Sequence, residues 1–169
     1  MSSHQIAVNA YLVINEKFLL LKRTKKPLIW GPPGGRLSKN EDPISGLKRE
    51  VYEETRLKIE VIQPITTWFG VFNKKHLLSI DYLSYANDED VYLSNEHSRY
   101  SWFSLDELHQ KRSMLFVYET GFQLSDFMRA WIVHLCLQQE FQRLEKVYTK
   151  KHFKKYLLNQ KQYLPEQKF

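Results

Sequence analysis

The sequence predicts an α/β domain with a helical extension at its C-terminus. Strand-like runs rich in β-branched and aromatic residues stand on both sides of one short amphipathic segment that begins near Pro43. From Gly121 to about Gln162, by contrast, apolar residues recur at helical spacing. We therefore expect a domain over residues 1–118, followed by an extension over residues 119–169 that packs on the domain or on a second subunit.

Length and composition limit the kinds of protein to consider. With 169 residues, 43% of them hydrophobic and 14% aromatic, the chain can bury the core of one globular domain. The single cysteine, Cys136, excludes an internal disulfide, and the cysteine–histidine spacing of zinc sites is missing. The chain shows neither an apolar run approaching a membrane span nor a charged-then-apolar leader. These features predict a cytoplasmic protein without a transmembrane segment.

Two strands are expected before the helix. Ile6–Ile14 is rich in Val, Ile and Tyr, and Asn15–Glu16 forms a turn into Lys17–Arg23. The continuous apolar run Phe18–Leu21 is typical of a strand that is covered on both faces. Arg23 ends this strand, where its guanidinium is a candidate contact to a phosphate group.

An acidic helix is predicted to begin at Asp42. Asp42 is a favourable N-cap residue, and Pro43 suits the first helical position because its missing N–H costs nothing there. One face of the helix is apolar and can dock on a core; it carries Ile44, Leu47 and Val51. Another face gathers carboxylates at positions i, i+3 and i+4; these are Glu50, Glu53 and Glu54. Such a run by itself is more often a solvated acidic surface.

The residues before the helix favour a metal site instead. Gly31–Gly35 forces a tight turn, in which a glycine carbonyl can approach a metal ion without a Cβ in the way. Three neighbouring carboxylates repel one another unless a hard cation such as Mg²⁺ binds among them. Turn, helix and carboxylate face together predict a site for a divalent cation.

The spacing of this segment resembles the signature of the Nudix hydrolases. The matching positions are Gly35, Glu41, Arg49, Glu50, Val51, Glu53, Glu54 and Leu57. A pattern with so many positions is far more specific than a lone glycine-rich loop. The family usually has glycine just before the last apolar residue, where this chain has Arg56. Because that glycine resembles a helix C-cap, we expect Arg56 to cost on the order of 1 kcal/mol or to end the helix differently.

The resemblance implies a fold and a reaction. The implied fold is an α/β/α sandwich with a mixed, curved sheet. The implied reaction is hydrolysis of the pyrophosphate bond in a nucleoside diphosphate linked to another group, assisted by Mg²⁺ or alternatively Mn²⁺. Nucleoside triphosphates and nucleotide sugars are the expected substrates. The proline or tyrosine that marks ADP-ribose and dinucleoside-polyphosphate subfamilies is missing at the corresponding positions, Phe72–Lys75.

The resemblance also assigns roles to individual residues. The expected metal-binding residues are Gly35, Glu50, Glu53 and Glu54. The metal would lower the pKa of a bound water, and Glu50 or Glu96 would accept the proton of that water. Arg49 would orient a neighbouring carboxylate through charge-assisted hydrogen bonds. Arg23 and Arg36 are the candidate substrate-binding residues.

Further strands are expected after the helix. Leu57–Ile65 and Thr66–Phe72 are predicted as consecutive strands interrupted at Pro64, which signals a bulge or an edge strand. Asn73–Lys75 then turns the chain into His76–Ala86. Aromatic residues on these strands could stack on a base, although strand aromatics usually fill a core; they are Trp68, Phe69, Phe72 and Tyr85.

A loop carboxylate precedes the last predicted strand. Glu96 stands six residues before Trp102, which is similar to the offset at which many Nudix enzymes place a further acidic residue. The adjacent His97 is more often a bystander, because metal-assisted hydrolysis does not require a histidine. Ser104 and Glu107 form a capping box and therefore predict a short helix.

The basic character of the chain is concentrated at its C-terminus. Residues 140–169 contain eight Lys or Arg and three Glu, a net charge of +5 out of +6 for the whole chain. Basic residues mixed with aromatic residues could bind RNA or an anionic membrane surface, although a solvated terminal helix is favoured. Two alternative functions therefore stay open, an RNA 5′-end pyrophosphohydrolase and a non-catalytic nucleotide sensor. A homodimer formed through the extension is also possible.

Overall fold

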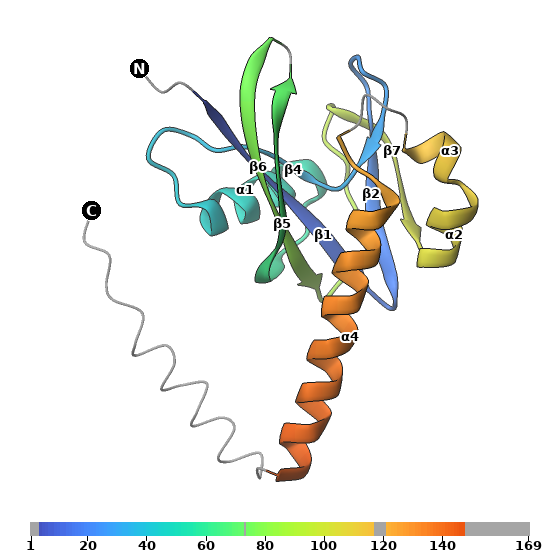
Figure 1. Ribbon diagram of the computed structural model, residues 1–169. Helices are drawn as coiled ribbons and strands as arrows, with labels where there is room; N and C mark the ends of the chain where they lie inside the picture. The colour runs from blue at the N-terminus through green and yellow to red at the C-terminus, as the bar shows by residue number, and fades with distance from the viewer. Residues whose placement is uncertain (1–3, 73, 117–120, 148–169) are drawn as a thin grey trace. The chain divides into compact units, whose positions relative to one another are not determined.

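The computed structural model describes residues 4–72, 74–116 and 121–147. Within these residues the strands are β1 (Gln5–Ile14), β2 (Lys17–Arg23), β3 (Trp30–Gly31), β4 (Gly34–Arg36), β5 (Ile59–Phe72), β6 (Lys75–Ala86) and β7 (His97–Phe103). The helices are α1 (Pro43–Thr55), α2 (Leu105–Gln110), α3 (Arg112–Leu115) and α4 (Leu124–Val147). The chain divides into two compact units, residues 1–131 and 132–169, and the first contains these strands, α1 to α3 and the start of α4 (Figure 1).

The strands form one mixed sheet, which confirms the predicted α/β class. Its order is β3-β2-β1-β6-β5, with β4 also paired to β1 and β7 to β2. β1 runs parallel to β6, whereas the other pairs are antiparallel. β1 pairs with β2 at Val13↔Phe18 and Ile14↔Lys17, close to the turn that joins them. Farther along, β1 pairs with β4 while β2 pairs with β3 and β7, so the two strands diverge.

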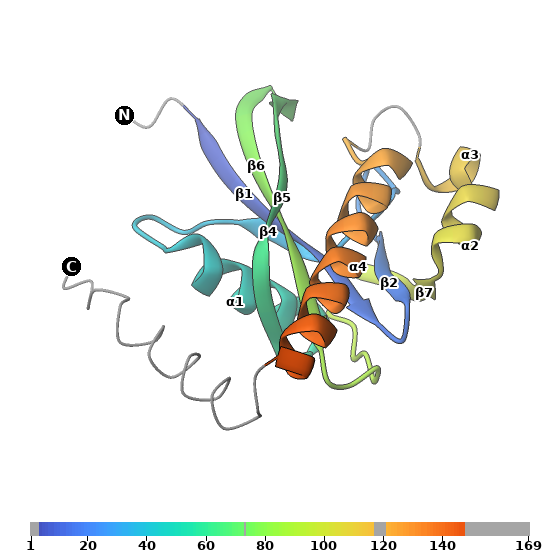
Figure 2. The same cartoon turned by 60° about the horizontal axis from the view of Figure 1, so that its bottom comes forward.

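The alternating side chains of β1 reach two different layers. Val8 belongs to a buried cluster that also contains Leu47 and Val51 of α1. Tyr11 points to the other face, where its ring lies 4.7 Å from that of Phe127 in the first turns of α4. Because successive strand residues face opposite sides, α1 and the start of α4 cover opposite faces of β1 (Figure 2).

Helix α1 begins and ends with well-defined caps. The Asp42 side chain accepts hydrogen bonds from the backbone N–H groups of Ile44 and Ser45, and Pro43 is the first helical residue, as predicted. Ile44 itself is 44% exposed and takes no part in the buried cluster. Arg56 ends the helix in the left-handed conformation with a φ of 64°. Its guanidinium lies 5.3 Å from the centre of the Tyr52 ring, a cation–π contact that offsets part of the strain.

The region around Pro64 forms one strand rather than two. β5 is continuous from Ile59 to Phe72, with irregular register between Val61 and Gln63 and between Pro64 and Thr66. The prediction of two strands was wrong because the residues on both sides of the proline pair with the same partner, β6. A proline lacks one ladder hydrogen bond, and here a bulge accommodates it.

Helices α2 and α4 were predicted from the sequence, whereas the single turn of α3 was not. The capping box of Ser104 and Glu107 begins α2. α4 is described over Leu124–Val147, and the predicted continuation to Gln162 lies outside the described residues. None of the helices in the described part of the chain is long and apolar enough to cross a membrane. The boundary after residue 118 stays a prediction.

Candidate functional site

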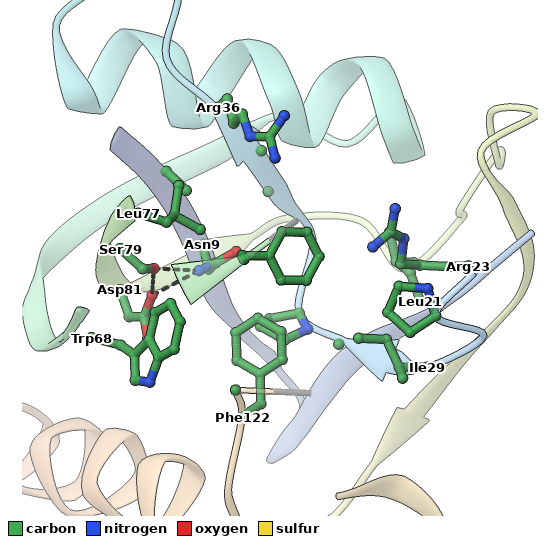
Figure 3. Close-up of a pocket in the computed structure, with 18 of the residues that line it drawn as sticks. Asn9, Leu21, Arg23, Ile29, Arg36, Trp68, Leu77, Ser79, Asp81 and Phe122 are labelled. Atoms are coloured by element: carbon green, nitrogen blue, oxygen red, sulfur yellow. Dashed lines mark hydrogen bonds between the residues drawn. The ribbon is translucent and has the colours of Figure 1, made fainter. Parts of the chain in front are cut away.

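A cleft of about 1800 Å³ opens where β1 and β2 diverge. Its lining comes from the cleft-facing sides of β1, β5 and β6, from the end of β2, and from the turn between β3 and β4. Helix α1, the segment before β7 and the segment before α4 complete it. Figure 3 shows a polar group of Asn9, Ser79 and Asp81 together with Trp68, and the two arginines Arg23 and Arg36 at other parts of the lining.

One end of the cleft is acidic. The carboxylates of Glu50, Glu54 and Glu96 all belong to its lining. The Gly34 N–H donates a hydrogen bond of 2.8 Å to Glu54 Oε2. The Glu50 carboxylate packs against Gly35 so closely that a Cβ at this position would overlap with it. The turn therefore needs glycine to make room for a carboxylate, in addition to its predicted use in exposing a carbonyl.

Glu54 is a buried carboxyl with an unusual pKa. Its pKa is raised from 4.5 to about 8, chiefly by burial, with a contribution from the charges of Glu50 and Glu96; the Gly34 N–H and the Arg23 charge act in the opposite direction. Burial also raises the pKa of Glu50, against the lowering effect of Arg49. Two desolvated carboxyls of like charge are an environment that a bound cation would stabilise.

Arg49 organises the carboxylates next to the cleft. Its Nε lies 2.7 Å from Glu41 Oε1, one Nη lies 2.9 Å from Glu50 Oε1, and the other lies 3.1 Å from Glu53 Oε2. Glu41 also accepts a hydrogen bond from the Ser38 N–H, and these contacts lower its pKa to about 2. Glu41 thus supports the loop between β4 and α1.

Glu53 is placed differently from the other two helix carboxylates. Its side chain is 56% exposed, it is paired with Arg49, and it is not part of the cleft lining. Within the described residues, no group of three or more His, Cys, Asp or Glu side chains is arranged to hold a metal ion. The hard oxygen donors of Gly35, Glu50 and Glu54 fit a divalent cation in their chemistry. Glu53 would join them by leaving Arg49, which its exposure allows.

Glu96 and His97 enter the cleft from the segment before β7. The Thr24 backbone N–H and hydroxyl both donate hydrogen bonds of 2.9 Å to the Glu96 carbonyl, which ties this segment to the end of β2. His97 Nε2 lies 3.7 Å from Glu54 Oε1. Burial lowers the pKa of His97, and its Nδ1 has no hydrogen-bond partner within the described residues. From the sequence we expected His97 to be a bystander, because metal-assisted hydrolysis does not require a histidine. The structure brings His97 to the cleft by pairing it with Arg23 between β2 and β7, a contact that no local pattern encodes.

Positive charge surrounds the cleft as well. Arg23 and Arg36, the two residues proposed from the sequence, both line it, and so does Lys26. In the described part of the chain, none of these three cations forms an ion pair with a carboxylate. Cations without a protein partner are available to a phosphate group.

The other end of the cleft combines aromatic rings with a buried polar cluster. Trp68 lies over Gly70, and Phe122 lies over Gly31, so closely in both cases that a Cβ on the glycine would collide with the ring. Phe72 also lines this end. Phe69 points to the opposite side of β5, where it is 59% exposed. Of the four strand aromatics considered from the sequence, Trp68 and Phe72 therefore reach the cleft.

The polar cluster consists of Asn9, Ser79 and Asp81. The Asn9 Nδ2 donates hydrogen bonds of 2.7 Å to Ser79 Oγ and 2.8 Å to Asp81 Oδ1. Ser79 Oγ donates a third, of 2.6 Å, to the same Asp81 oxygen. Burial raises the pKa of Asp81, while the hydrogen bonds from Asn9 and Ser79 lower it. Sequence reasoning missed this cluster, because Asn9 lies some seventy residues before its partners and no local pattern signals the contact.

Comparisons with known proteins show the family that this chain is similar to. Residues 3–123 match the family model described as the NUDIX domain. The chain is 31% identical over 123 residues to the asymmetrical bis(5′-nucleosyl)-tetraphosphatase of Sus scrofa, covering 68% of this chain and 84% of that protein. It is 27% identical over 115 residues to a MutT-like protein of Streptomyces ambofaciens, covering 67% and 72%. The solved structure of a MutT protein from Methanosarcina mazei Go1 matches with a TM-score of 0.65 and 26% identity, covering 78% of this chain and 95% of that one.

Proposed function

Because this chain belongs to the Nudix hydrolase family, we propose that it cleaves the pyrophosphate bond of a nucleoside diphosphate linked to another group, with nucleoside triphosphates or nucleotide sugars as substrates. The observation that carries this proposal is the joining of two unlike ends in one cleft. The acidic end suits a cation-bound phosphate chain, and the aromatic end suits a base.

At the acidic end, some residues would bind the metal ion, and Arg49 would orient one of the metal-binding carboxylates. Gly35, Glu50 and Glu54 would hold Mg²⁺ or Mn²⁺, joined by Glu53 after it exchanges its Arg49 partner. The bound metal would neutralise phosphate charge and lower the pKa of a water. Arg49 keeps one Glu50 oxygen in place through a contact of 2.9 Å.

Two further roles follow from the lining of the cleft. Glu50 and Glu96 are the candidate acceptors of the proton released by the attacking water, because both carboxylates lie in the cleft. Arg23 and Arg36 would contact phosphates of the substrate, since neither forms an ion pair with a carboxylate within the described residues.

The direct test is phosphate release from a nucleotide panel with Mg²⁺. The panel holds nucleoside triphosphates, nucleotide sugars and a dinucleoside tetraphosphate, the last because a relative is named for that substrate. We expect turnover that disappears with EDTA. An inactive protein that still binds nucleotides would indicate a sensor, and turnover confined to 5′-triphosphorylated RNA would indicate an RNA 5′-end pyrophosphohydrolase. Either result would overturn the proposal.

Variants of the helix carboxylates test the assigned residues. Glu54→Gln and Glu53→Gln should each lower Mg²⁺-dependent turnover by about 100-fold or more, because each removes a charged metal ligand. Glu60→Gln is the matched control, since Glu60 is exposed on β5 and does not line the cleft. Unchanged turnover in Glu53→Gln would exclude Glu53 from the metal site and leave Glu54 to be judged by its own variant.

A further inference from the structure

The geometry points to a base-selective subsite in which Asn9, Ser79 and Asp81 present hydrogen-bond acceptors to the cleft and Trp68 forms a stacking wall. This subsite would select guanine, the base whose Watson–Crick edge carries two adjacent donors. That the ligand is a nucleotide rests on the proposed function, whereas the choice of base follows from the hydrogen-bond donors and acceptors of the cluster.

The four residues share one face of the sheet. Asn9 pairs with Asp81 between β1 and β6, and Ser79 pairs with Trp68 between β6 and β5. Directly paired residues point to the same side, as do residues two apart on a strand. All four belong to the lining of the cleft, and Figure 3 shows Trp68 beside the hydrogen-bonded cluster.

The polar side-chain hydrogens of Asn9 and Ser79 are all donated within the cluster. Asp81 is an acceptor when ionised, which requires that Asn9 turn its NH₂ group toward it. Both Nδ2 hydrogens of Asn9 are used, one for Ser79 and one for Asp81. The single Ser79 hydroxyl hydrogen is used for Asp81. The Tyr11 hydroxyl is a further hydrogen-bond donor beside Asp81 and helps to lower its pKa. What the three side chains have left for a ligand is therefore acceptor capacity, on Asn9 Oδ1 and on the Asp81 lone pairs that these donors do not use.

An acceptor-only surface discriminates among bases. Guanine presents the N1–H and the 2-amino group side by side, so both acceptors can be satisfied. Adenine places the acceptor N1 beside its amino donor, and uracil places carbonyl oxygens on both sides of its N–H, so each would leave acceptors facing one another. A polar site rejects a ligand that leaves its groups unpaired far more strongly than an apolar site rejects a missing methylene.

The aromatic walls are held in position by glycines. The Trp68 indole lies on Gly70, two residues along the same strand, and the Phe122 ring lies on Gly31. Any side chain on either glycine would displace the ring, so the positions of both rings depend on glycine at residues 31 and 70. Stacking on such rings contributes about 1–3 kcal/mol per base and does not depend on which base is bound.

The subsite adjoins the acidic end. Asn9 pairs with Gly34 between β1 and β4, and the Gly34 N–H donates to Glu54. The same short stretch of backbone thus links the polar cluster to the carboxylate that faces the phosphates. A nucleotide with its base on the cluster would direct its phosphates toward Glu54.

Binding of nucleoside monophosphates tests this inference apart from hydrolysis, because they contain no pyrophosphate bond. Isothermal titration of the full chain at pH 8 with Mg²⁺ should give an affinity for GMP about tenfold higher than for IMP, which lacks only the 2-amino group. AMP should bind as weakly as IMP. Affinities for GMP and IMP within twofold of each other would overturn the subsite, whatever the protein hydrolyses.

Variants separate the cluster from the stacking wall. Asp81→Asn introduces a donor and should reduce the preference for GMP over IMP to about twofold; Ser79→Ala serves the same purpose if the first variant does not fold. Trp68→Leu should weaken GMP, IMP and AMP in parallel, by about tenfold. Phe69→Leu is the matched control, because Phe69 is the next residue on β5 and faces the other side. An unchanged preference in both cluster variants would overturn the assignment of these residues.

Hydrolysis and base selection can fail independently. If GMP binds preferentially but the panel shows no turnover, the proposed reaction is wrong and the subsite stands. If the panel shows turnover without preference between GMP and IMP, the reaction stands and the subsite is wrong.

Discussion

Two buried carboxyls, one at each end of the cleft, have opposite surroundings. Glu54 at the acidic end is 8% exposed, accepts a hydrogen bond from Gly34, and lies among like charges that help raise its pKa to about 8. Asp81 at the polar end is 3% exposed and accepts hydrogen bonds from Asn9 and Ser79. Burial raises the pKa of both carboxyls, but the charges of Glu50 and Glu96 add to this shift at Glu54, whereas hydrogen bonds from Asn9 and Ser79 oppose it at Asp81.

The difference shows how one cleft can contain both a reactive and a rigid region. A carboxyl whose charged form is disfavoured gains most from exchanging its proton for a metal ion. A carboxyl that already accepts short hydrogen bonds holds its neighbours in a defined arrangement, which is what recognition of a base requires. Stability measurements on the metal-free protein can distinguish the contribution of Glu54 from that of Asp81.

Removing the Asp81 carboxylate should have the largest effect on stability. Asp81→Ala leaves buried hydrogens of Asn9 and Ser79 without an acceptor, which should lower the free energy of unfolding by about 3 kcal/mol. Urea unfolding in EDTA at pH 7 measures this change. Asp90→Ala is the control, because Asp90 is exposed in the loop that follows β6. A loss no larger than in the control would show that the cluster is not a satisfied network.

Glu54 should produce a smaller effect, of the opposite sign and dependent on pH. Its pKa in the folded protein, about 8, lies above the 4.5 of an unperturbed glutamate. Between these values the unfolded chain releases the proton while the folded chain keeps it, so stability falls as pH rises from 4.5 toward 8. Glu54→Gln removes this dependence, and should make the metal-free protein more stable than wild type by about 2 kcal/mol at pH 8.

Thermal unfolding in EDTA at pH 5 and pH 8 measures the Glu54 effect. The stabilisation by Glu54→Gln should be present at pH 8 and nearly vanish at pH 5, and added Mg²⁺ should raise the melting temperature of wild type alone. A variant that is equally destabilised at both pH values would contradict a raised pKa of Glu54 in the folded protein.

Arg56 should show the smallest effect, since it closes α1 outside both ends of the cleft. Arg56→Ala keeps the left-handed strain and loses the contact with Tyr52, so it should cost about 0.5–1 kcal/mol. Arg56→Gly relieves the strain but also loses that contact, so it should be nearly neutral. Urea unfolding measures both, and neither variant should alter the response to Mg²⁺. A change in that response would mean that the end of α1 controls the acidic end.

Features that depend on neighbouring residues could be predicted from the sequence. Asp42 with Pro43 predicts the start of α1, and Ser104 with Glu107 predicts the start of α2, because a cap needs only groups within one helical turn. The acidic residues of α1 were recognised for the same reason. The sequence did not show that these residues differ in position, with Glu50 and Glu54 in the cleft and Glu53 outside it. That difference depends on Arg49, which contacts Glu53 and also Glu41 in the loop before the helix.

Features that depend on strand register could not be predicted. The pairing of Asn9 with Asp81 and of Arg23 with His97 brings together residues some seventy positions apart, and no local pattern encodes such a contact. At Pro64 the two kinds of feature separate: the proline itself predicts a bulge or an edge strand, and β5 is an edge strand with a bulge there. That the residues on both sides of it belong to one strand depends on their common pairing with β6.

By itself, the sequence determined the α/β class, the family signature and the acidic helix, because periodicity, capping and spacing act over a few residues. The tertiary structure decided which carboxyls are buried, which are satisfied and which cations stay without an ion pair among the described residues. Burial and hydrogen bonding are properties of the surroundings of a group, and those surroundings are assembled from distant parts of the chain.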